Sequence, residues 1–355
     1  MSLKRKFEKF YNRSMPLLTV EYWYQGERYG LSKITDKSVY YNPLFVYKKN
    51  KATDVYYETT NPNWYKPLID YFKRYPRRFS RLANQYEKEC QKLLKLSKKA
   101  KYQDFSKIFN LHISNWPKLS MIISLGELFE EFNSNESIKK NQLRKIAEQA
   151  YQIRQRTDRI EYLPGIDPSI LAKELLPKFK DFTNFLTFKE IVNNDIPDKN
   201  ELRKRKKQYI YFNGKIHTGL NIKQLEKTAN ISILQKKNKL FSDTILHFRG
   251  TTAMTGQVKG RAKIVFETKH LKKINKGDIL VSPMTTPDYL MAMTKASGFI
   301  TDEGGITCHA AIVAREINKP CIINTKIATQ FLKDGDLIDV NANQGVVRVI
   351  KRKNE

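Results

Sequence analysis

The residues best suited to chemistry lie in one stretch, Gly298 to Pro320, with the sequence GFITDEGGITCHAAIVAREINKP. A short β-branched run leads into two glycines, Gly304 and Gly305, and His309 then begins an expected helix. Glycines let the backbone turn sharply, and the free amides at a helix N-terminus favour a bound anion. The pattern therefore indicates a phosphate site beside His309.

His309 suits covalent phosphoryl transfer because an imidazole pKa of about 6.5 leaves one ring nitrogen unprotonated near neutral pH. The Thr307 hydroxyl could cap the helix or donate to a phosphoryl oxygen, whereas Arg315 could face the site only from the second turn. Cys308 could be a nucleophile itself or simply fill space. A buried, hydrogen-bonded histidine at a helix start explains His309 equally well, so both interpretations stay open at this point.

Two different patterns surround this stretch. Before residue 240 the apolar residues recur at helical spacing, and after residue 248 short β-branched runs and glycines replace them. Helices are expected over Trp64 to Phe72, Phe79 to Leu96, Trp116 to Phe132, Ile138 to Arg156 and His309 to Ile317. Strands are expected over Gln257 to Phe266, Asp278 to Val281, Gly298 to Thr301, Cys321 to Asn324, Leu337 to Val340 and Val346 to Ile350, with a strand-like run also at Ser38 to Tyr47. We therefore predict an α+β protein in which a mostly helical domain with a mixed aromatic first segment, residues 1–245, precedes a β-rich domain, residues 246–355.

Seven short motifs lie along this second part: Gly256 to Gly260, Gly277 to Val281, Thr286 to Asp288, Thr301 to Glu316, Pro320 to Ile322, Asp334 to Asp336 and Gly345 to Val347. With these motifs, the sequence from about Gly250 to Val349 resembles the phosphohistidine swivelling domain. That domain is the mobile part of phosphoenolpyruvate-utilising enzymes such as phosphoenolpyruvate synthase, pyruvate phosphate dikinase and rifampicin phosphotransferase. The resemblance implies a β/β/α swivelling fold.

The resemblance also implies that His309 carries a phosphoryl group between a nucleotide-binding domain and a second site. Gly304, Gly305, Thr307, Cys308 and Arg315 are then the expected phosphate-binding residues. Cys308 stands where the family usually has serine.

A donor domain is not evident in the chain. There is no Gly-rich phosphate loop of an ATP-grasp domain, no Walker-type motif and no alternating pattern for a phosphoenolpyruvate-binding barrel. We therefore expect an ATP-grasp protein to act in trans and to hold the ATP and magnesium. The helical part is similar, more weakly, to the region preceding the swivelling domain in rifampicin-phosphotransferase-like proteins, which makes it a possible acceptor or docking domain for a small molecule.

The remaining polar residues suggest less specific roles. His112, His217, His247 and His270 lack metal-ligand spacing, so we expect surface or capping residues and no bound metal. Asp302 and Glu303 are adjacent and point to opposite faces, so we expect loop polar groups or docking charges. The basic run Arg203 to Lys207 is expected on a helix with part of it in solvent.

Composition limits the wider possibilities. The chain has 355 residues, 65 Lys and Arg against 36 Asp and Glu, a net charge of +29 and three cysteines. Few cysteines, a charged start and no long apolar run favour a cytoplasmic protein without a membrane segment. A nucleic-acid-binding protein usually concentrates its positive charge on one face, whereas here the charge is spread along the chain, as coding bias alone can produce. Nucleic-acid binding is therefore only the third hypothesis, after the phosphoryl carrier and a non-catalytic scaffold that keeps the swivelling fold.

Overall fold

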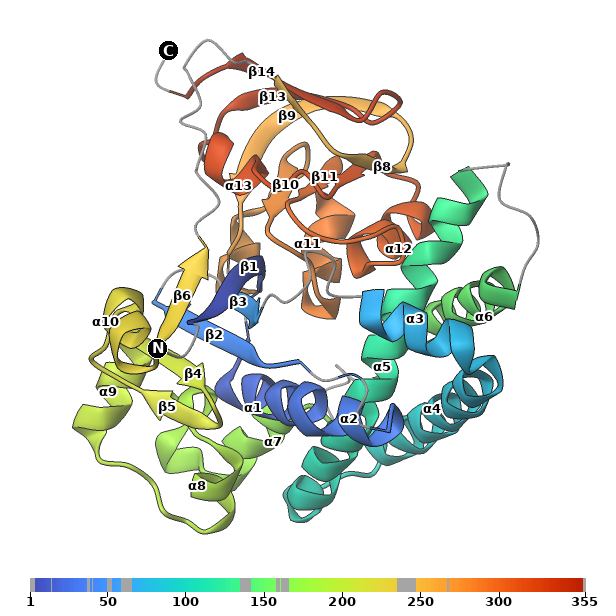
Figure 1. The fold of residues 1–355 in the computed structure, drawn as a ribbon. Coiled ribbons are helices and arrows are strands. Elements are labelled where there is room, and N and C mark those ends of the chain that lie inside the picture. Colours follow the sequence, from blue (N-terminus) through green and yellow to red (C-terminus); the bar gives the residue numbers. More distant parts are fainter. Residues whose placement is uncertain are drawn as a thin grey trace. The chain divides into compact units, whose positions relative to one another are not determined.

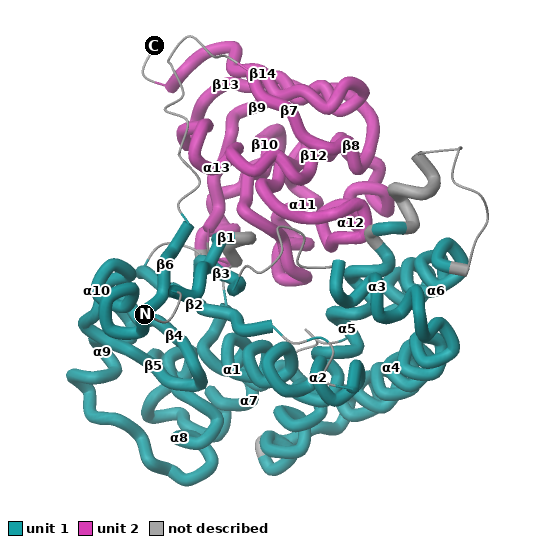
Figure 2. The backbone as a smooth tube through the Cα atoms, in the orientation of Figure 1, with its two compact units in different colours: residues 1–10, 15–49, 53–235 teal, residues 11–14, 50–52, 236–355 magenta. Residues whose placement is uncertain are grey.

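The computed structural model divides the chain into two compact units (Figure 2). Unit 1 is formed by residues 1–10, 15–49 and 53–235, and unit 2 by residues 11–14, 50–52 and 236–355. The structure describes residues 4–13, 15–36, 39, 41–49, 53–58, 66–134, 142–157, 160, 166–234, 247–266 and 268–353. The predicted boundary between residues 245 and 246 lies outside these described residues.

Unit 1 contains a six-stranded sheet with the strand order β5-β4-β2-β3-β1-β6 (Figure 1). Its strands are β1 Arg5–Arg13, β2 Pro43–Lys48, β3 Thr53–Glu58, β4 Gln208–Phe212, β5 Lys215–His217 and β6 Ile231–Leu234. Alternating side chains of β2 lie on opposite faces of the sheet. Leu44 and Val46 share a core with Leu225 of helix α10, Ile222–Thr228. The ring of Phe45 packs on the other face against Trp23 of helix α1, Leu17–Gln25. Helices therefore cover both faces of this sheet.

The sequence predicts five of the helices described in unit 1, the third to the sixth and the ninth, close to where they lie, whereas the other five were not predicted. They are α1 Leu17–Gln25, α2 Leu31–Ile34, α3 Lys66–Arg74, α4 Pro76–Ser97, α5 Phe105–Ser134, α6 Gln142–Thr157, α7 Pro168–Leu175, α8 Phe188–Val192, α9 Lys199–Lys207 and α10 Ile222–Thr228. A π-helical turn, Gly26–Gly30, joins α1 to α2. The glycines at its two ends lie close to α5, because a Cβ at Gly26 would meet Trp116 and one at Gly30 would meet Pro117.

Unit 2 is built on an eight-stranded sheet with the order β7-β14-β13-β9-β10-β11-β12-β8. The four strands β9 to β12 pair in parallel, and antiparallel strands continue the sheet on both sides. The strands are β7 His247–Arg249, β8 Thr251–Met254, β9 Gln257–Ile264, β10 Ile279–Ser282, β11 Gly298–Thr301, β12 Cys321–Ile323, β13 Leu337–Asn341 and β14 Val346–Lys351. The predicted strands of this part are confirmed, and β13 and β14 pair in antiparallel as a hairpin.

Two hydrophobic cores lie on the two faces of this sheet. Leu280 belongs to one core and its neighbours Ile279 and Val281 to the other, as the alternation of a strand requires. The first core also holds apolar residues of helices α11 Leu290–Lys295 and α12 His309–Glu316, and the second holds residues of α13 Ala328–Phe331. The parallel order puts the loop after β11 at the carboxyl edge of the sheet, from which α12 begins.

The predicted α+β class is confirmed. The first segment of the chain differs in detail, because it contributes three strands to a sheet where we expected one strand-like run before a helical domain. Local pattern could not show this sheet, since β1 pairs with β6 from the far end of the unit.

Candidate functional site

The loop between β11 and α12 carries the predicted site. Gly304 adopts φ = +118°, and a Cβ at this position would lie 2.7 Å from the sulfur of Cys308. Both the backbone angle and the close approach require glycine. The amide of Cys308 donates to the carbonyl of Gly305 at 2.9 Å, which closes a turn directly before the helix. Gly304, Gly305, Thr307, Cys308 and His309 thus form one tight corner, as the sequence predicts.

His309 is the first residue of α12, and its ring is buried. The residue is 6% exposed, and Nδ1 lies 2.9 Å from the Thr285 hydroxyl oxygen. The Nε2 atom is buried as well. The imidazole of the described structure is therefore enclosed, and a donor could reach a ring nitrogen only after the side chains around it move.

Thr285 is a site residue that sequence reasoning missed. Thr285 comes directly before the segment Thr286 to Asp288, which is one of the motifs on which the resemblance rests. It lies 24 positions before His309, so the contact between the two residues is not apparent from the sequence. A threonine hydroxyl can donate or accept. When Nδ1 carries the proton and donates to Thr285, Nε2 keeps its lone pair. The contact can thus determine which ring nitrogen carries the proton.

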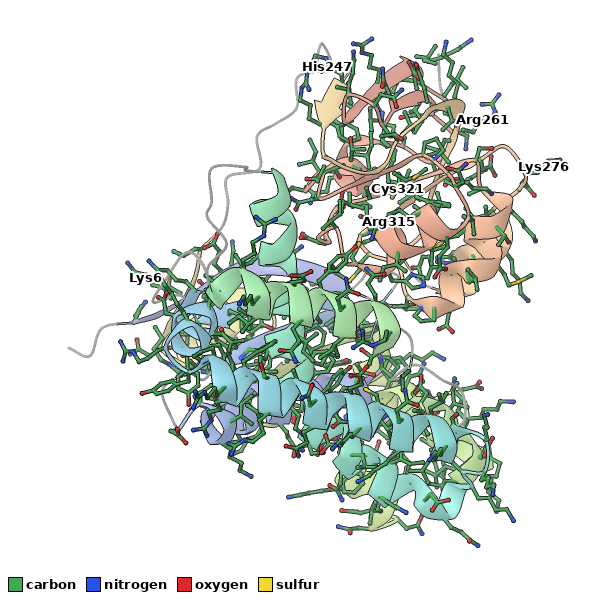
Figure 3. All side chains as sticks on the ribbon, turned by 90° about the vertical axis from the view of Figure 1, so that its right-hand side faces the viewer. Lys6, His247, Arg261, Lys276, Arg315 and Cys321 are labelled. Atoms are coloured by element: carbon green, nitrogen blue, oxygen red, sulfur yellow. The ribbon has the colours of Figure 1, made fainter. Side chains whose placement is uncertain are left out.

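Arg315 contacts backbone carbonyls of the site loop and of β8. Its guanidinium donates to the carbonyl of Ile306 at 2.7 Å and to the carbonyl of Ala253 at 3.5 Å. Arg315 therefore reaches back from the second turn of α12 and holds the site loop against β8. Figure 3 shows Arg315 and Cys321 within the outline of unit 2, whereas Arg261, Lys276 and His247 lie at its edge. The binding of a phosphate by Arg315 stays a prediction.

Thr307 and Cys308 occupy the two positions directly before the helix. Thr307 is 3% exposed, and Cys308 is half-buried at the N-cap, where its side chain makes no capping hydrogen bond. Cys308 packs against the core that contains Cys321, and burial raises the pKa of the Cys321 thiol well above its usual value. This packing agrees with the space-filling interpretation of Cys308.

Asp302 is a loop polar group, the first of the two expected roles, and it is too buried to be a docking charge. Asp302 is 3% exposed, and its carboxylate accepts from the Thr325 hydroxyl at 3.1 Å and from the Thr329 amide at 3.1 Å. Glu303 pairs with Lys326 at 2.8 Å. Burial raises the pKa of Asp302, so the group anchors the site loop to the start of α13 and offers no surface charge.

Unit 1 buries carboxyl groups of another kind. Glu27, on the π-helical turn, is 1% exposed, and its Oε1 accepts from the indole nitrogens of Trp23 at 2.5 Å and Trp116 at 3.4 Å. Burial raises the pKa of Glu27 to about 7. Glu21 accepts from the amide of Phe188 at 2.7 Å, and burial raises its pKa to about 7 as well. Neither group was predicted from the sequence, because Trp116 and Phe188, which donate to them, come from distant segments.

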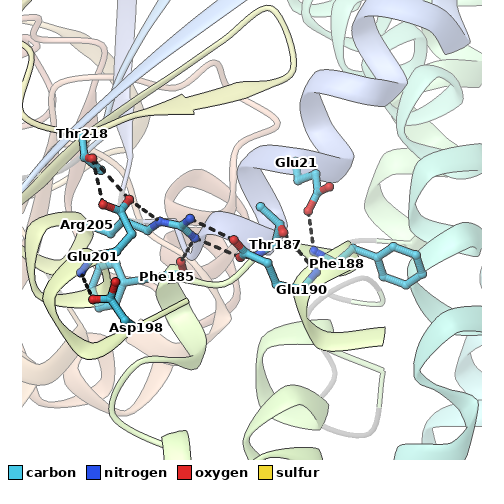
Figure 4. Close-up of polar contacts among 9 residues, drawn as sticks. All are labelled: Glu21, Phe185, Thr187, Phe188, Glu190, Asp198, Glu201, Arg205 and Thr218. Atoms are coloured by element: carbon cyan, nitrogen blue, oxygen red, sulfur yellow. Dashed lines mark hydrogen bonds and ion pairs between the residues drawn. The ribbon is translucent and has the colours of Figure 1, made fainter. Parts of the chain in front are cut away.

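The basic run of α9 contains one buried member (Figure 4). Arg205 binds both carboxylate oxygens of Glu190 at 2.9 Å and also donates to Glu201 at 3.1 Å. The other four basic residues of the run are exposed, as predicted. Arg205 therefore joins α8 to α9 and is not available to a ligand.

The other histidines do not form a site. His247 is exposed as expected, but His112 is 3% exposed, with Nε2 2.8 Å from the carbonyl of Ile166 and its ring stacked on Tyr22, so the surface assignment is wrong for His112. Within the described ranges no cluster of three or more histidine, cysteine or acidic side chains is arranged to hold a metal ion. Nor does any helix in those ranges have the length and apolar character needed to cross a membrane.

Comparison with known proteins places the site inside a matched segment. Residues 274–345 match the family model described as PEP-utilising enzyme, mobile domain. This segment is related to that mobile domain. It contains Thr285, the glycine corner, His309 and Arg315.

Curated relatives match about a third of the chain. A probable phosphoenolpyruvate synthase of Archaeoglobus fulgidus is 48% identical over 99 residues, which cover 28% of this chain and 13% of the relative. One of Methanothermobacter thermautotrophicus is 52% identical over 99 residues, which cover 28% and 14%. An uncharacterized phosphotransferase of Bacillus subtilis is 37% identical over 131 residues, which cover 37% and 15%. The match thus spans only about one seventh of the length of these relatives.

Proposed function

We propose that unit 2 is the phosphoryl carrier of a phosphotransferase related to phosphoenolpyruvate synthase, with His309 as the phosphorylated residue. The observation that carries the proposal is the position of His309 at the glycine corner inside the matched segment, with Nδ1 beside the Thr285 hydroxyl. An ATP-grasp protein supplies the phosphoryl group in trans and holds ATP and magnesium. A small molecule then accepts the group, and unit 1 is the proposed acceptor or docking part.

In the loading step, the lone pair of Nε2 attacks the phosphorus of the donor, and the bond from phosphorus to the leaving oxygen breaks. Thr285 accepts the hydrogen bond from Nδ1–H and stabilises the positive charge that develops on the ring. The amides at the start of α12 favour the incoming negative charge. Because the ring is 6% exposed, loading also requires the surrounding side chains to open when the donor binds.

The test is phosphorylation of the full chain by purified ATP-grasp donors with labelled ATP. We expect label that is stable in base and labile in acid, and loss of nearly all of it in His309→Ala. His247→Ala, which changes an exposed histidine of the same unit, is the matched control and should label like the wild type. Label that survives His309→Ala contradicts the assignment of this residue.

The burial of His309 favours a second candidate, a non-catalytic scaffold that keeps the swivelling fold. This alternative predicts a stable complex with an ATP-grasp protein and no label on any histidine. A donor that binds the chain and labels a known carrier, but leaves this chain unlabelled, would establish the scaffold function and overturn the carrier.

A further inference from the structure

Helix α4 carries a row of positive side chains on its exposed face. The apolar side chains of this helix are buried on the opposite face: Phe79, Leu82, Ala83, Tyr86, Cys90 and Leu93. Five exposed residues are basic and follow one another at intervals of four, seven, four and three positions: Arg77, Arg81, Lys88, Lys92 and Lys95. With 3.6 residues per turn, these intervals place the five within about 60° of one another around the helix and over a length of about 27 Å. We call these five residues the α4 row.

The acidic residues of the same helix do not cancel this charge. Helix α4 contains two of them, Glu87 and Glu89. Glu87 pairs with Arg156 of α6 at 2.6 Å, and Glu89 pairs with Lys118 of α5 at 2.7 Å. Both acids are therefore neutralised by cations of the two helices that lie along α4 (Figure 1), and the α4 row keeps its positive charge.

No member of the α4 row forms an ion pair with another residue in the part of the chain that the structure describes. Asp36 lies within electrostatic reach of Arg81, but its carboxylate is bound by Arg78 at 2.8 Å. Like charges four residues apart on a helix repel each other, as Lys88 and Lys92 do. The α4 row therefore lowers the stability of its own helix, and a bound polyanion would remove this repulsion.

The other exposed residues of α4 indicate which polyanion fits. All three are amides, Asn84, Gln85 and Gln91, so the exposed face carries neither apolar nor aromatic side chains. A protein interface usually has an apolar or aromatic centre, and sites for single-stranded nucleic acid stack the bases on aromatic rings. Phosphates of a duplex are instead bound by lysine, arginine, asparagine and glutamine. This composition favours a duplex over an acidic protein.

We propose that the α4 row binds the phosphate backbone of double-stranded nucleic acid without reading its sequence. The five cations displace counterions from the phosphates, so binding depends steeply on salt, and the neighbouring amides donate to phosphate oxygens. This activity goes beyond the carrier function proposed for His309, because the α4 row belongs to unit 1 and His309 to unit 2.

Fluorescence anisotropy of the full chain with short labelled duplexes tests the proposal. The probes are two DNA duplexes of unrelated sequence and one RNA duplex, which shows which nucleic acid is preferred. We expect both DNA sequences to bind with the same affinity. The triple variant Arg81→Ala, Lys88→Ala, Lys92→Ala should weaken binding about tenfold or more and make the slope of log K against log salt shallower by about 3.

A second triple variant, Arg203→Ala, Lys204→Ala, Lys207→Ala, is the matched control. It also removes one arginine and two lysines, from exposed positions of α9 in the same unit, and should leave the slope nearly unchanged. Because all six positions are exposed, thermal unfolding should show that both variants are folded. Equal losses in the two variants would assign binding to overall charge and overturn the proposal. Binding of only one DNA sequence, or no duplex binding by the wild type at about 50 mM salt, would overturn it as well.

Discussion

The two units satisfy their buried carboxyl groups in different ways. In unit 2, Asp302 accepts from hydroxyl and amide groups of residues 325–329, and Asp336 accepts from Arg352 at 2.7 Å. In unit 1, Glu27 accepts from two indole nitrogens and Glu21 from a backbone amide, with no ion pair to either among the described residues. In unit 2, Asp302 fixes the loop before His309 and Asp336 fixes the segment around Arg352, whereas unit 1 buries two acids whose pKa values lie near 7.

This difference shows where function can reside in each unit. The groups around His309 hold a short loop in one conformation, which suits a residue that must be presented to a partner. The groups in unit 1 respond to pH and depend on contacts between distant segments. The following changes should separate the two units experimentally.

The largest effect is expected for Arg205→Ala in unit 1. Removing the guanidinium leaves Glu190 and Glu201 without their cation in a partly buried place, which should lower the free energy of unfolding by about 3–5 kcal/mol. Arg203→Ala, an exposed neighbour on the same helix, should change it by less than about 0.5 kcal/mol. Chemical denaturation followed by circular dichroism measures both, and equal effects would mean that the buried pair adds no stability.

The pH dependence of unit 1 should be the next largest effect. The pKa of Glu27 is about 7 in the folded state and near 4.5 in the unfolded chain, so the folded state binds more protons between these values. Stability therefore falls as the pH rises through this window, by about 3 kcal/mol for Glu27. Glu27→Gln should reduce the difference in stability between pH 5 and pH 8, measured by denaturation, and leave the part that comes from Glu21, whose pKa is also about 7. A profile that keeps its slope in this variant would assign the titration to another group, of which Glu21 is the first to test.

Gly304→Ala should have a smaller effect on stability and a clear one on unit 2. The left-handed backbone and the contact with the Cys308 sulfur make alanine unfavourable by about 1–3 kcal/mol. Because the strain falls on the corner that presents His309, phosphorylation should decrease more than stability. Gly219 also has a positive φ but open space around it, so Gly219→Ala is the matched control. If Gly304→Ala is labelled as well as the wild type, the corner tolerates rearrangement.

The smallest effect is expected for Cys308→Ser. The sulfur fills space beside the core and the serine restores the residue that the family usually has, so stability should change by less than about 1 kcal/mol. Labelling of His309 should be retained. Loss of labelling with retained stability would show that the thiol takes part in the reaction.

The contrast between the units also explains which features the sequence could predict. The strands and the helix around His309 were predicted because each element has its own short apolar pattern and the site residues follow one another closely. The sheet of unit 1 was only partly predicted, since β1 must pair with β6 from the other end of the unit. The burial of Glu21 and Glu27 was not predicted, because the sequence of an aromatic segment does not show whether its carboxyl groups face water or the interior.

The sequence by itself determined the glycine corner, the histidine after it and the strands that flank them along the chain, because backbone conformation and short-range pattern depend on neighbouring residues. Only the tertiary structure decided that His309 is enclosed with Thr285 at its Nδ1, that Arg315 holds the loop and that Asp302 is an internal anchor. These outcomes depend on which distant side chains share the interior, and burial is a property of the packed chain.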